Sequence, residues 1–364
     1  GVERLLGQVT RRYGLNDIHC IGSFKLANHD ALARADVLHI HGIHGNFFSY
    51  LALPGITAKK PTVFTLHDMW PLTGHCHASL ECDRWRTGCG SCPHLDTYPP
   101  VRRDATGIEW KLKKWTYERS ALTIISPSRW LRDLATESML ARFPVHHIPH
   151  GVETEVYEPL DRKFCRRLLG LPENKRVLLF VVERLDRPLK GADLLWKALD
   201  ALPSALKRET ALLFMGNSDG QFPSTLGMPI VDLGYVRNPR LKTIAFSAAD
   251  LFLHPTRAEA FGLVLAESLS CGTPVVSFAV GGVPELVRPG VTGLLAEPEN
   301  VSQFAAAIAQ LLEDRAGLSV MGRRCREIAV SEYSLDLQVE RHLALYRDLA
   351  GDVRMPQAEL AAAV

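Results

Sequence analysis

Two glutamates at the start of a predicted helix are the first residues whose types and spacing could do chemistry. Glu259 follows a short apolar strand expected at 250–253, and Glu267 comes eight residues later. Free N–H groups at the start of a helix, with the positive end of its dipole, suit an anionic or hydroxyl-rich ligand. Gly262 would let such a ligand approach the backbone, and Glu267 would suit a diol such as a ribose. Taken alone, two glutamates eight residues apart are more typical of a solvated helix.

Two cations lie at the turn after the first predicted strand of the same half of the chain. Arg184 and Lys190 flank this turn, and cations opposite a helix N-terminus are what a departing diphosphate needs for charge neutralisation. The competing interpretation is solvation at the surface, the usual state of lysine and arginine. Tyr235 and Val236 follow a strand expected at 230–233 and are placed to pack against a base.

The elements that would position these residues follow the pattern of an α/β protein. In the second half, short apolar strands are expected at 176–182, 211–215, 230–233, 250–253, 274–278 and 293–295. They alternate with amphipathic helices at 192–202, 241–247, 262–270 and 283–287, which predicts a parallel sheet with both faces covered. Further helices are expected at 301–313, 318–330 and 335–349, and the Ala-rich tail 355–364 is expected to fray.

The first half follows the same pattern more loosely. Strands expected at 37–41, 62–66, 122–125 and 147–149 lead into polar residues. Ligands collect at the carboxyl ends of strands in open α/β sheets, so one wall of a cleft is expected to contain His39, His41, His67 and Asp68. The segment 150–159 lacks a strong period and is interpreted as the linker between two domains.

Length and composition limit the class of protein. At ~150 residues per domain, 364 residues correspond to about two domains. Apolar residues at 46% and charged residues at 23% exclude disorder, collagen and coiled coil. A net charge of +2 gives no reason to expect nucleic acid as a partner. The two halves nevertheless differ in chemistry, because 12 of the 14 histidines and five of the eight cysteines lie in residues 1–150.

Motif searches remove several enzyme classes. The chain contains no G-x-G-x-x-G and no G-x-x-x-x-G-K-[ST], the usual fingerprints of dinucleotide oxidoreductases and P-loop nucleotide hydrolases. One G-x-S-x-G match surrounds Ser218, directly after the strand expected at 211–215. A nucleophile elbow needs a helix next, whereas Pro223, Gly227 and Pro229 follow and break helices. A plain polar turn is predicted there.

In this order the residues resemble the retaining glycosyltransferases of family 4, which have the GT-B fold of two Rossmann-like domains with parallel sheets facing across a cleft. The resemblance covers nearly the whole chain. It rests on the Glu259/Glu267 block, the Arg184 and Lys190-Gly191 pair, Pro149-His150-Gly151-Val152-Glu153, Ser126-Pro-Ser-Arg-Trp-Leu131 and Cys271-Gly-Thr-Pro-Val-Val276. Through Thr65-Leu-His-Asp-Met-Trp70-Pro-Leu-Thr-Gly-His75-Cys76 it is most similar to bacterial exopolysaccharide members of the colanic-acid type.

The resemblance implies a role for each matching residue. Arg184 and Lys190 would hold the donor diphosphate, Glu267 the ribose, and Glu259 with nearby amides the donor sugar. The implied donor-binding set is Arg184, Lys190, Tyr235, Val236, Glu259, Ala260, Phe261, Gly262, Leu263 and Glu267. On the acceptor side, His67 with Asp68 would orient the sugar or accept the acceptor proton. Transfer with retention is drawn as same-face displacement, in which the leaving phosphate deprotonates the acceptor hydroxyl, so catalysis depends on positioning and charge stabilisation at His67, Glu259, Arg184 and Lys190.

Three departures from the family pattern stand out. Glu183 occupies the usual place of a glycine before the donor arginine, and His150 replaces the usual linker asparagine. The family begins with a strand and a Gly-rich loop, and no such loop precedes Asp17, so an N-terminal segment is expected to be missing. The missing segment favours one alternative to the transferase, a catalytically inactive nucleotide-sugar-binding or scaffold protein. Among enzymes, the alternative is a nucleotide-sugar epimerase of GT-B fold.

A group of cysteines is a second signal in the first half. Cys76, Cys82, Cys89 and Cys92 end in a C-x2-C segment with glycine and proline around it, which resembles half of a structural zinc site. His75 or His77 could replace one thiolate. The alternatives are free thiols in a loop or, less consistent with the lack of a secretory signal, disulfides. A metal here would hold a long loop beside the acceptor cleft and take no part in catalysis.

Basic and aromatic residues gather at 110–119, with Arg102 and Arg103 nearby. This segment could dock on anionic lipid near a lipid-linked acceptor. The competing interpretation, an ordinary amphipathic surface helix with a half-buried Trp115, is favoured because one short helix is weak evidence. The expected location is the cytoplasm, because the sequence shows no secretory signal. The alternative is peripheral contact with the inner face of the cell membrane through 102–119.

The sequence as a whole predicts an acceptor-side Rossmann-like domain at 1–155, a donor-binding one at 156–335, and a C-terminal helix and tail at 336–364. The predicted activity is transfer of a hexose from a UDP- or GDP-sugar to a glycan or lipid-linked acceptor in polysaccharide biosynthesis. No cofactor is expected for the chemistry and no nucleic-acid partner.

Overall fold

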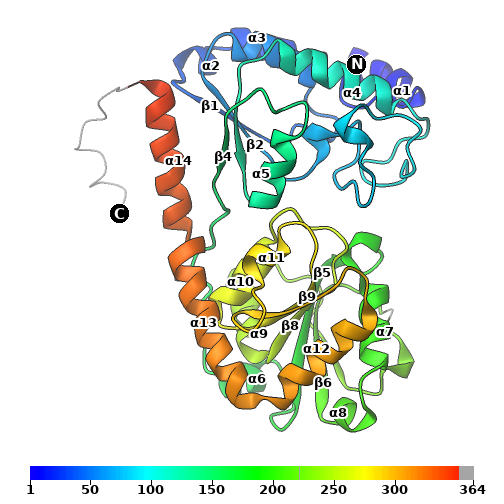
Figure 1. The fold of residues 1–364 in the computed structure, drawn as a ribbon, viewed down its shortest axis with the longest axis vertical. Coiled ribbons are helices and arrows are strands. Elements are labelled where there is room, and N and C mark those ends of the chain that lie inside the picture. The colour runs from blue at the N-terminus through cyan, green and yellow to red at the C-terminus, as the bar shows by residue number, and fades with distance from the viewer. Residues whose placement is uncertain (221, 352–364) are drawn as a thin grey trace. The chain divides into compact units, whose positions relative to one another are not determined.

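The computed structural model describes residues 1–220 and 222–351, which divide into two compact units (Figure 1). The first unit contains Gly1–Pro127, Leu131–Ile148 and the C-terminal residues from Val339 onward. The second contains Ser128–Trp130 and Pro149–Gln338. The segment 150–159, interpreted as a linker, thus belongs wholly to the second unit, and the predicted tail 355–364 lies outside the described residues.

The first unit is built on a four-stranded parallel sheet in the order β1-β2-β3-β4. Its strands are β1 (Leu38–His41), β2 (Thr62–Thr65), β3 (Thr123–Ser126) and β4 (Val145–His147). Its helices are α1 (Val2–Arg12), α2 (Asp30–Arg34), α3 (Leu53–Thr57), α4 (Thr106–Glu118) and α5 (Arg129–Thr136), the first residues of α5 grouping with the second unit. All residues of β2 and β3 are buried, as expected for inner strands of a parallel sheet.

The second unit has a six-stranded parallel sheet in the order β10-β9-β8-β5-β6-β7. The strands are β5 (Arg176–Arg184), β6 (Thr210–Asn217), β7 (Ile230–Asp232), β8 (Leu251–His254), β9 (Val275–Phe278) and β10 (Gly293–Ala296). The helices that cover them are α6 (Arg162–Leu168), α7 (Ala192–Asp200), α8 (Ser204–Arg208), α9 (Pro239–Ala248), α10 (Leu263–Ser270), α11 (Val283–Leu286) and α12 (Val301–Glu313). The apolar run of β5 occupies an inner position of the sheet, where both faces are covered.

Two long helices end the described chain. Helix α13 (Arg315–Tyr333) packs against α10 of the second unit, and α14 (Leu335–Ala350) carries Leu345 into a small core of the first unit with Val63, Ile125 and Ile148. Between the helices, Val152 N–H donates to Tyr333 O at 2.8 Å and Leu335 N–H to Val152 O at 2.9 Å. A Cβ at Gly151 would lie 2.5 Å from Leu335 Cα, so this approach requires glycine.

The predicted fold class is confirmed, since each unit is a parallel α/β sheet covered by helices. The strands and helices expected in the second half are present within a few residues of their predicted bounds. The helix expected near 110–119 differs more, because α4 begins earlier and Lys113 is fully buried, whereas Trp115 is half-buried as predicted, with 46% of it exposed. The polar turn predicted at Ser218 is confirmed, because its hydroxyl donates to Asp232 Oδ2 at 2.6 Å and accepts from Gly220 N–H, and the next helical segment among the described residues is only a short 3-10 helix at Ser224–Leu226.

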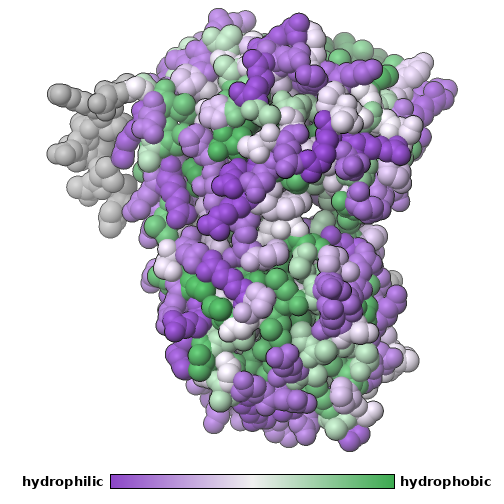
Figure 2. All heavy atoms as spheres, in the orientation of Figure 1, coloured by the Kyte–Doolittle hydropathy of each residue, from purple (hydrophilic) through white to green (hydrophobic). Residues whose placement is uncertain are grey.

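Among the described residues, no helix is both long enough and apolar enough to cross a membrane. On the face shown in Figure 2, hydrophilic side chains predominate and hydrophobic ones form smaller areas.

Candidate functional site

The turn after β5 packs tightly on the loop after β8, at the carboxyl edge of the second sheet. Arg257 N–H donates to Leu189 O at 2.8 Å, and Thr256 Oγ1 donates to the same oxygen at 3.1 Å. Gly191 has a φ of 69°, and a Cβ there would lie 1.8 Å from Pro255 O. Only glycine allows this approach, and the two loops are thereby held together.

This packing brings Lys190 and Glu259 into contact. Lys190 Nζ lies 3.1 Å from Glu259 Oε2, and the fully buried His254 places its Nε2 3.7 Å from the same oxygen. Burial alone would raise the pKa of the Glu259 carboxyl, but the Lys190 ammonium and His254 outweigh it and hold this pKa at about 2. Glu259 is therefore a fixed anion beside a half-exposed cation. His254 was not among the predicted site residues.

The backbone of Glu259 is held by a pair of glycines. Gly282 N–H donates to Glu259 O at 2.9 Å, and a Cβ at Gly281 would lie 2.0 Å from that oxygen. A Cβ at Gly282 would lie 2.4 Å from Ala260 O. The two glycines therefore permit close packing of backbone on backbone.

Helix α10 begins directly after these residues. Its N-cap, Gly262, has a φ of 93° and supplies no side-chain hydrogen bond to the first N–H groups. Those groups and the helix dipole suit an anionic ligand. Phe261 is buried, with its ring edge-on to His150 at 5.3 Å and to Tyr333 at 5.9 Å, which fixes the start of the helix.

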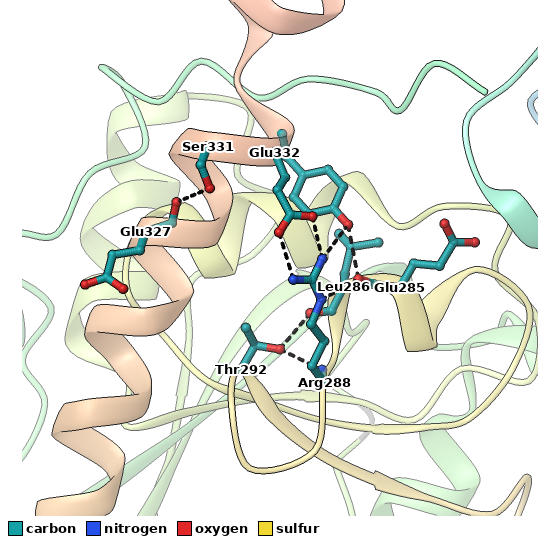
Figure 3. A network of polar contacts seen from close by, with 8 residues as sticks. Glu285, Leu286, Arg288, Thr292, Glu327, Ser331 and Glu332 are labelled. Atoms are coloured by element: carbon teal, nitrogen blue, oxygen red, sulfur yellow. Dashed lines mark hydrogen bonds and ion pairs between the residues drawn. The ribbon is translucent and has the colours of Figure 1, made fainter. Parts of the chain in front are cut away.

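A network at the end of α13 supports that aromatic contact (Figure 3). Arg288 Nη1 lies 2.8 Å from Glu332 Oε1, and Tyr333 OH donates to Glu285 O at 3.1 Å. Arg288 N–H also donates to Thr292 Oγ1 at 2.7 Å, and this bond connects the turn before β10 to the Arg288–Glu332 pair. None of these residues was predicted from sequence, because a partly buried Arg–Glu pair separated by 44 residues has no local signal.

Glu267 lies in a cavity of about 330 Å³ at the same edge of the sheet. The cavity contains four of the predicted donor-binding residues and is lined by Val181, Val182, Glu183, Met215, Gly216, Tyr235, Val236, Lys242, Leu263, Val264 and Glu267. Lys242 Nζ lies 3.4 Å from Glu267 Oε1, and Tyr157 hydrogen bonds the same carboxyl. Burial raises the Glu267 pKa, while Lys242 and Tyr157 oppose that shift. Lys242 and Tyr157 were not predicted.

Arg184 and Lys190 were predicted to bind one ligand together, but the structure shows Arg184 paired with a neighbouring carboxylate. Arg184 is exposed and binds Asp186 through two nitrogens, with Nε 2.9 Å from Asp186 Oδ1. Tyr235 is half-exposed, with the Arg237 guanidinium 5.6 Å from its ring centre. Arg184 would have to exchange Asp186 for a phosphate.

In the first unit, the polar residues at the ends of β1 and β2 do come together. His41 Nδ1 lies 2.9 Å from His67 Nε2, and the His39 ring lies 4.0 Å from that of His41. Asp68 instead pairs with His44, whose Nε2 is 3.0 Å from Asp68 Oδ2. Sequence reasoning expected four of these residues on one wall but did not include His44.

A buried lysine holds the loop that begins at His67. Lys113 of α4 donates from Nζ to Trp70 O at 2.8 Å and to Thr73 O at 2.9 Å, and lies 3.4 Å from the Trp70 ring centre. Burial lowers the Lys113 pKa to about 8. Sequence reasoning counted this residue among the basic side chains of 110–119 that could dock on anionic lipid, because a lysine within a Lys-rich helix has no local sign of burial.

The four predicted cysteine ligands line one small cavity of about 20 Å³, together with His75 and His94. Cys92 Sγ lies 3.4 Å from His75 Nε2, and Gly74 N–H donates to Cys89 Sγ at 3.2 Å. The donor types suit zinc. Within 1–220 and 222–351, however, no group of three or more His, Cys, Asp and Glu side chains is placed so as to hold a metal ion.

Two family models match separate stretches of the chain, one in each half. Residues 161–329 match the family Glycosyl transferases group 1, and residues 4–156 match Glycosyltransferase Family 4. D-inositol 3-phosphate glycosyltransferase 1 of Catenulispora acidiphila is 36% identical over 217 residues, which is 56% of this chain and 51% of that protein. The enzyme of the same name from Mycobacterium marinum is 37% identical over 58% of this chain and 46% of its own. The chain thus spans about half the length of the curated relatives it matches.

Solved structures agree on the fold. Sucrose-phosphate synthase from Thermosynechococcus elongatus superposes with a TM-score of 0.67 at 22% identity, over 89% of this chain and 77% of that one. Anabaena HepE gives 0.67 at 20% identity, over 89% and 81%. At these identities the likeness concerns the fold alone. The two units thus have the Rossmann-like parallel sheets of the GT-B fold, and residues 4–156 and 161–329 are similar to the Family 4 and group 1 models respectively.

Proposed function

We propose that this chain transfers a hexose, with retention, from a nucleotide diphosphate sugar to a hydroxyl acceptor. One observation carries the proposal: the Glu267 cavity, the α10 N-terminus and the Lys190–Glu259 contact all lie at one edge of the group 1 domain. Supporting it, the curated relatives are named as glycosyltransferases, and HepE was solved in complexes with UDP and with UDP-glucose.

Each part of this edge has a chemical task. The cavity would take the nucleoside, with Glu267 accepting hydrogen bonds from the ribose diol and Tyr235 and Val236 against the base. Lys190 and Arg184 would neutralise the diphosphate, and the first N–H groups of α10 would add a positive field. Glu259, kept ionised, would accept hydrogen bonds from hydroxyls of the donor sugar.

Transfer on one face of the sugar needs few groups that move protons. The bond between the anomeric carbon and the phosphate oxygen breaks, and the acceptor oxygen bonds to that carbon from the same side. The acceptor proton passes to the leaving phosphate. Cations that stabilise the developing phosphate charge then supply most of the acceleration, while His67 orients the sugar or the acceptor hydroxyl.

Two acceptor classes have separate support. The Leu66-His67-Asp68 segment with its cysteine loop favours a glycan or lipid-linked acceptor of exopolysaccharide type. The names of the curated relatives favour an inositol phosphate. A panel of radiolabelled transfers to inositol 3-phosphate, to a soluble glycan and to a polyprenyl-linked sugar distinguishes them. Vesicle co-sedimentation with an anionic lipid tests whether 102–119 adds a membrane contact at the inner face.

Calorimetric titration of UDP, GDP and their hexose derivatives tests the donor site. We expect one nucleotide to bind, and Lys190→Ala and Glu267→Ala each to weaken it by about 1.5–3 kcal/mol, the value of a hydrogen bond to a charged group. Lys163→Ala and Glu158→Ala, exposed residues of the same unit, serve as matched controls. Unchanged affinity in both site variants would exclude this assignment. Binding without transfer would favour the inactive binding protein, and interconversion of the donor sugar would favour the epimerase.

We also keep the structural zinc as a proposal, supported by the shared cavity of four cysteines and two histidines. Elemental analysis of the purified protein tests it. About one zinc per chain, lost in Cys92→Ser, supports the site. Folded protein without zinc excludes it and leaves four free thiols.

A further inference from the structure

The contact between His41 and His67 is not used by the proposed mechanism. His41 is the last residue of β1, and His67 lies two residues after the end of the adjacent parallel strand β2. The two strand ends are in register, with His41 opposite Thr65. His41 Nδ1 lies 2.9 Å from His67 Nε2, and their rings are 5.2 Å apart and inclined by 31°. A neutral imidazole has one N–H and one acceptor nitrogen. One ring must therefore donate to the other, and the choice sets which nitrogen of His67 carries its proton.

The His41 ring is itself held in place. His39 lies against it at 4.0 Å between ring centres. Both nitrogens of His39 are engaged, Nε2 with Thr65 Oγ1 at 2.6 Å and Nδ1 with the Tyr346 hydroxyl of α14. A ring whose two nitrogens have partners on β2 and on α14 cannot turn freely. The tilted contact of the His39 ring restrains the His41 ring, and the hydrogen bond of His41 in turn restrains His67.

We propose that His41 is a positioning residue for His67: its hydrogen bond fixes the ring plane and the single tautomer with which His67 meets the sugar or the acceptor hydroxyl. This rests on the proposed function in so far as His67 contacts substrate. Both side chains keep contact with solvent, yet partial desolvation lowers the pKa of each ring and the neighbouring histidines lower it further, which supports a neutral pair.

The charged and titratable groups that face the pair come from four segments. His39 lies on β1, His342 and Tyr346 on α14, His44 on the loop after β1, and Asp68 directly after His67. Asp68 alone favours the protonated form of His67, and the histidines oppose it. The pair is accordingly expected to stay neutral at pH 7 and to lose its defined hydrogen bond when acidification protonates both rings.

Nitrogen chemical shifts of ¹⁵N-histidine-labelled protein test the proposal directly, with the His67 signals identified from their loss in His67→Ala. We expect one tautomer of His67 in the wild type and a mixture in His41→Leu. His41→Gln, whose amide can still donate or accept, should keep the single tautomer. The exposed His146→Gln on β4 is the matched control. A single, unchanged His67 tautomer in folded His41→Leu overturns the proposal, and the same result in His41→Ala does so should the leucine variant not fold.

Turnover supplies the second readout. A misplaced catalytic group costs up to about 100-fold, so His41→Leu should lower kcat by about 10- to 100-fold, with KM for the donor nearly unchanged and partial recovery in His41→Gln. The acid limb of the kcat profile should also shift. If the wild type transfers no sugar, the proposed function fails, while the chemical shifts still decide whether His41 sets the tautomer. If His41→Leu transfers as fast as wild type although His67→Ala does not, His41 is no positioning residue.

Discussion

Each unit contains a lysine that interacts with a glutamate, Lys113 with Glu109 inside helix α4 and Lys190 with Glu259 at the sheet edge, and the two pairs behave in opposite ways. In the second unit, Lys190 lies 3.1 Å from Glu259 and His254 is close by, and the Glu259 pKa falls to about 2. In the first, burial raises the Glu109 pKa to about 7 and lowers the Lys113 pKa to about 8. The residue types are the same, and the difference lies in burial and in direct pairing.

The physical reason lies in what each charge has for partners. Glu109 accepts from Asn16 N–H at 2.6 Å and from the Tyr50 hydroxyl, while Lys113 donates to two backbone carbonyls. Those neutral partners include the carbonyls of the loop after His67, which Lys113 holds in place. They offset only part of the free energy needed to bury a charge. Lys190 keeps 43% of its side chain exposed, so its amino group can turn to a ligand. One pair is suited to structure and the other to binding.

The largest effect is expected at Lys113. Lys113→Ala removes two buried hydrogen bonds, leaves the carbonyls of Trp70 and Thr73 without them, and opens a cavity, so the free energy of unfolding should fall by about 3–5 kcal/mol. Lys114→Ala, on the next position of the same helix but half-exposed, should change it by less than about 1 kcal/mol. Urea unfolding of both variants measures this. Equal effects would mean that the buried lysine is no anchor.

The next effect is a pH dependence with an unusual sign. The folded state binds a proton at Glu109 up to about pH 7, whereas the unfolded chain releases it near 4.5. Between these values the folded state binds more protons, so this group's contribution to stability is present below pH 4.5 and is lost as the pH rises to 7. Urea unfolding from pH 4.5 to 7.5 should therefore show the free energy of unfolding of the wild type falling relative to that of Glu109→Gln as the pH rises. A flat difference contradicts the raised pKa.

A smaller dependence of opposite sign is expected at His39. Burial lowers the pKa of His39 to about 3 from the 6.5 of the unfolded chain. Below pH 6.5 the unfolded state binds the extra proton, so the free energy of unfolding falls as the pH drops from 6.5 towards 3. Partial exposure of the ring screens the effect. His39→Gln should show a weaker acid dependence between pH 6.5 and 4, and an identical slope would argue against a neutral His39 in the fold.

The smallest stability effect is expected at Lys190. Because this lysine is half-exposed, loss of its pair with Glu259 should cost less than about 1 kcal/mol in unfolding free energy, even though the same variant should weaken nucleotide binding. Thermal unfolding of Lys190→Ala with and without saturating nucleotide measures both. A loss comparable to that of Lys113→Ala would remove the contrast between the two pairs.

Local sequence accounted for much of the donor side. Glu259, Glu267, Tyr235, Val236 and Leu263 were predicted for one ligand, and four of these line the cavity while Glu259 contacts Lys190. These residues follow strand ends of a regular βα pattern, and parallel strands bring such ends to one edge. Spacing could not reveal that Asp186 binds Arg184, or that Tyr157 and Lys242 meet Glu267. Those partners come from separate segments.

By itself, the sequence determined the two α/β units, the order of nearly all their strands and helices, and the segments that carry the candidate chemistry, because apolar periodicity and turn residues act over short distances. Only the tertiary structure decided which charges are buried and what faces them. Lys113 and Lys114 are adjacent in the chain, yet one is fully buried on two carbonyls and the other half-exposed. Desolvation depends on every element packed around a group, and that environment is assembled from residues distant in sequence.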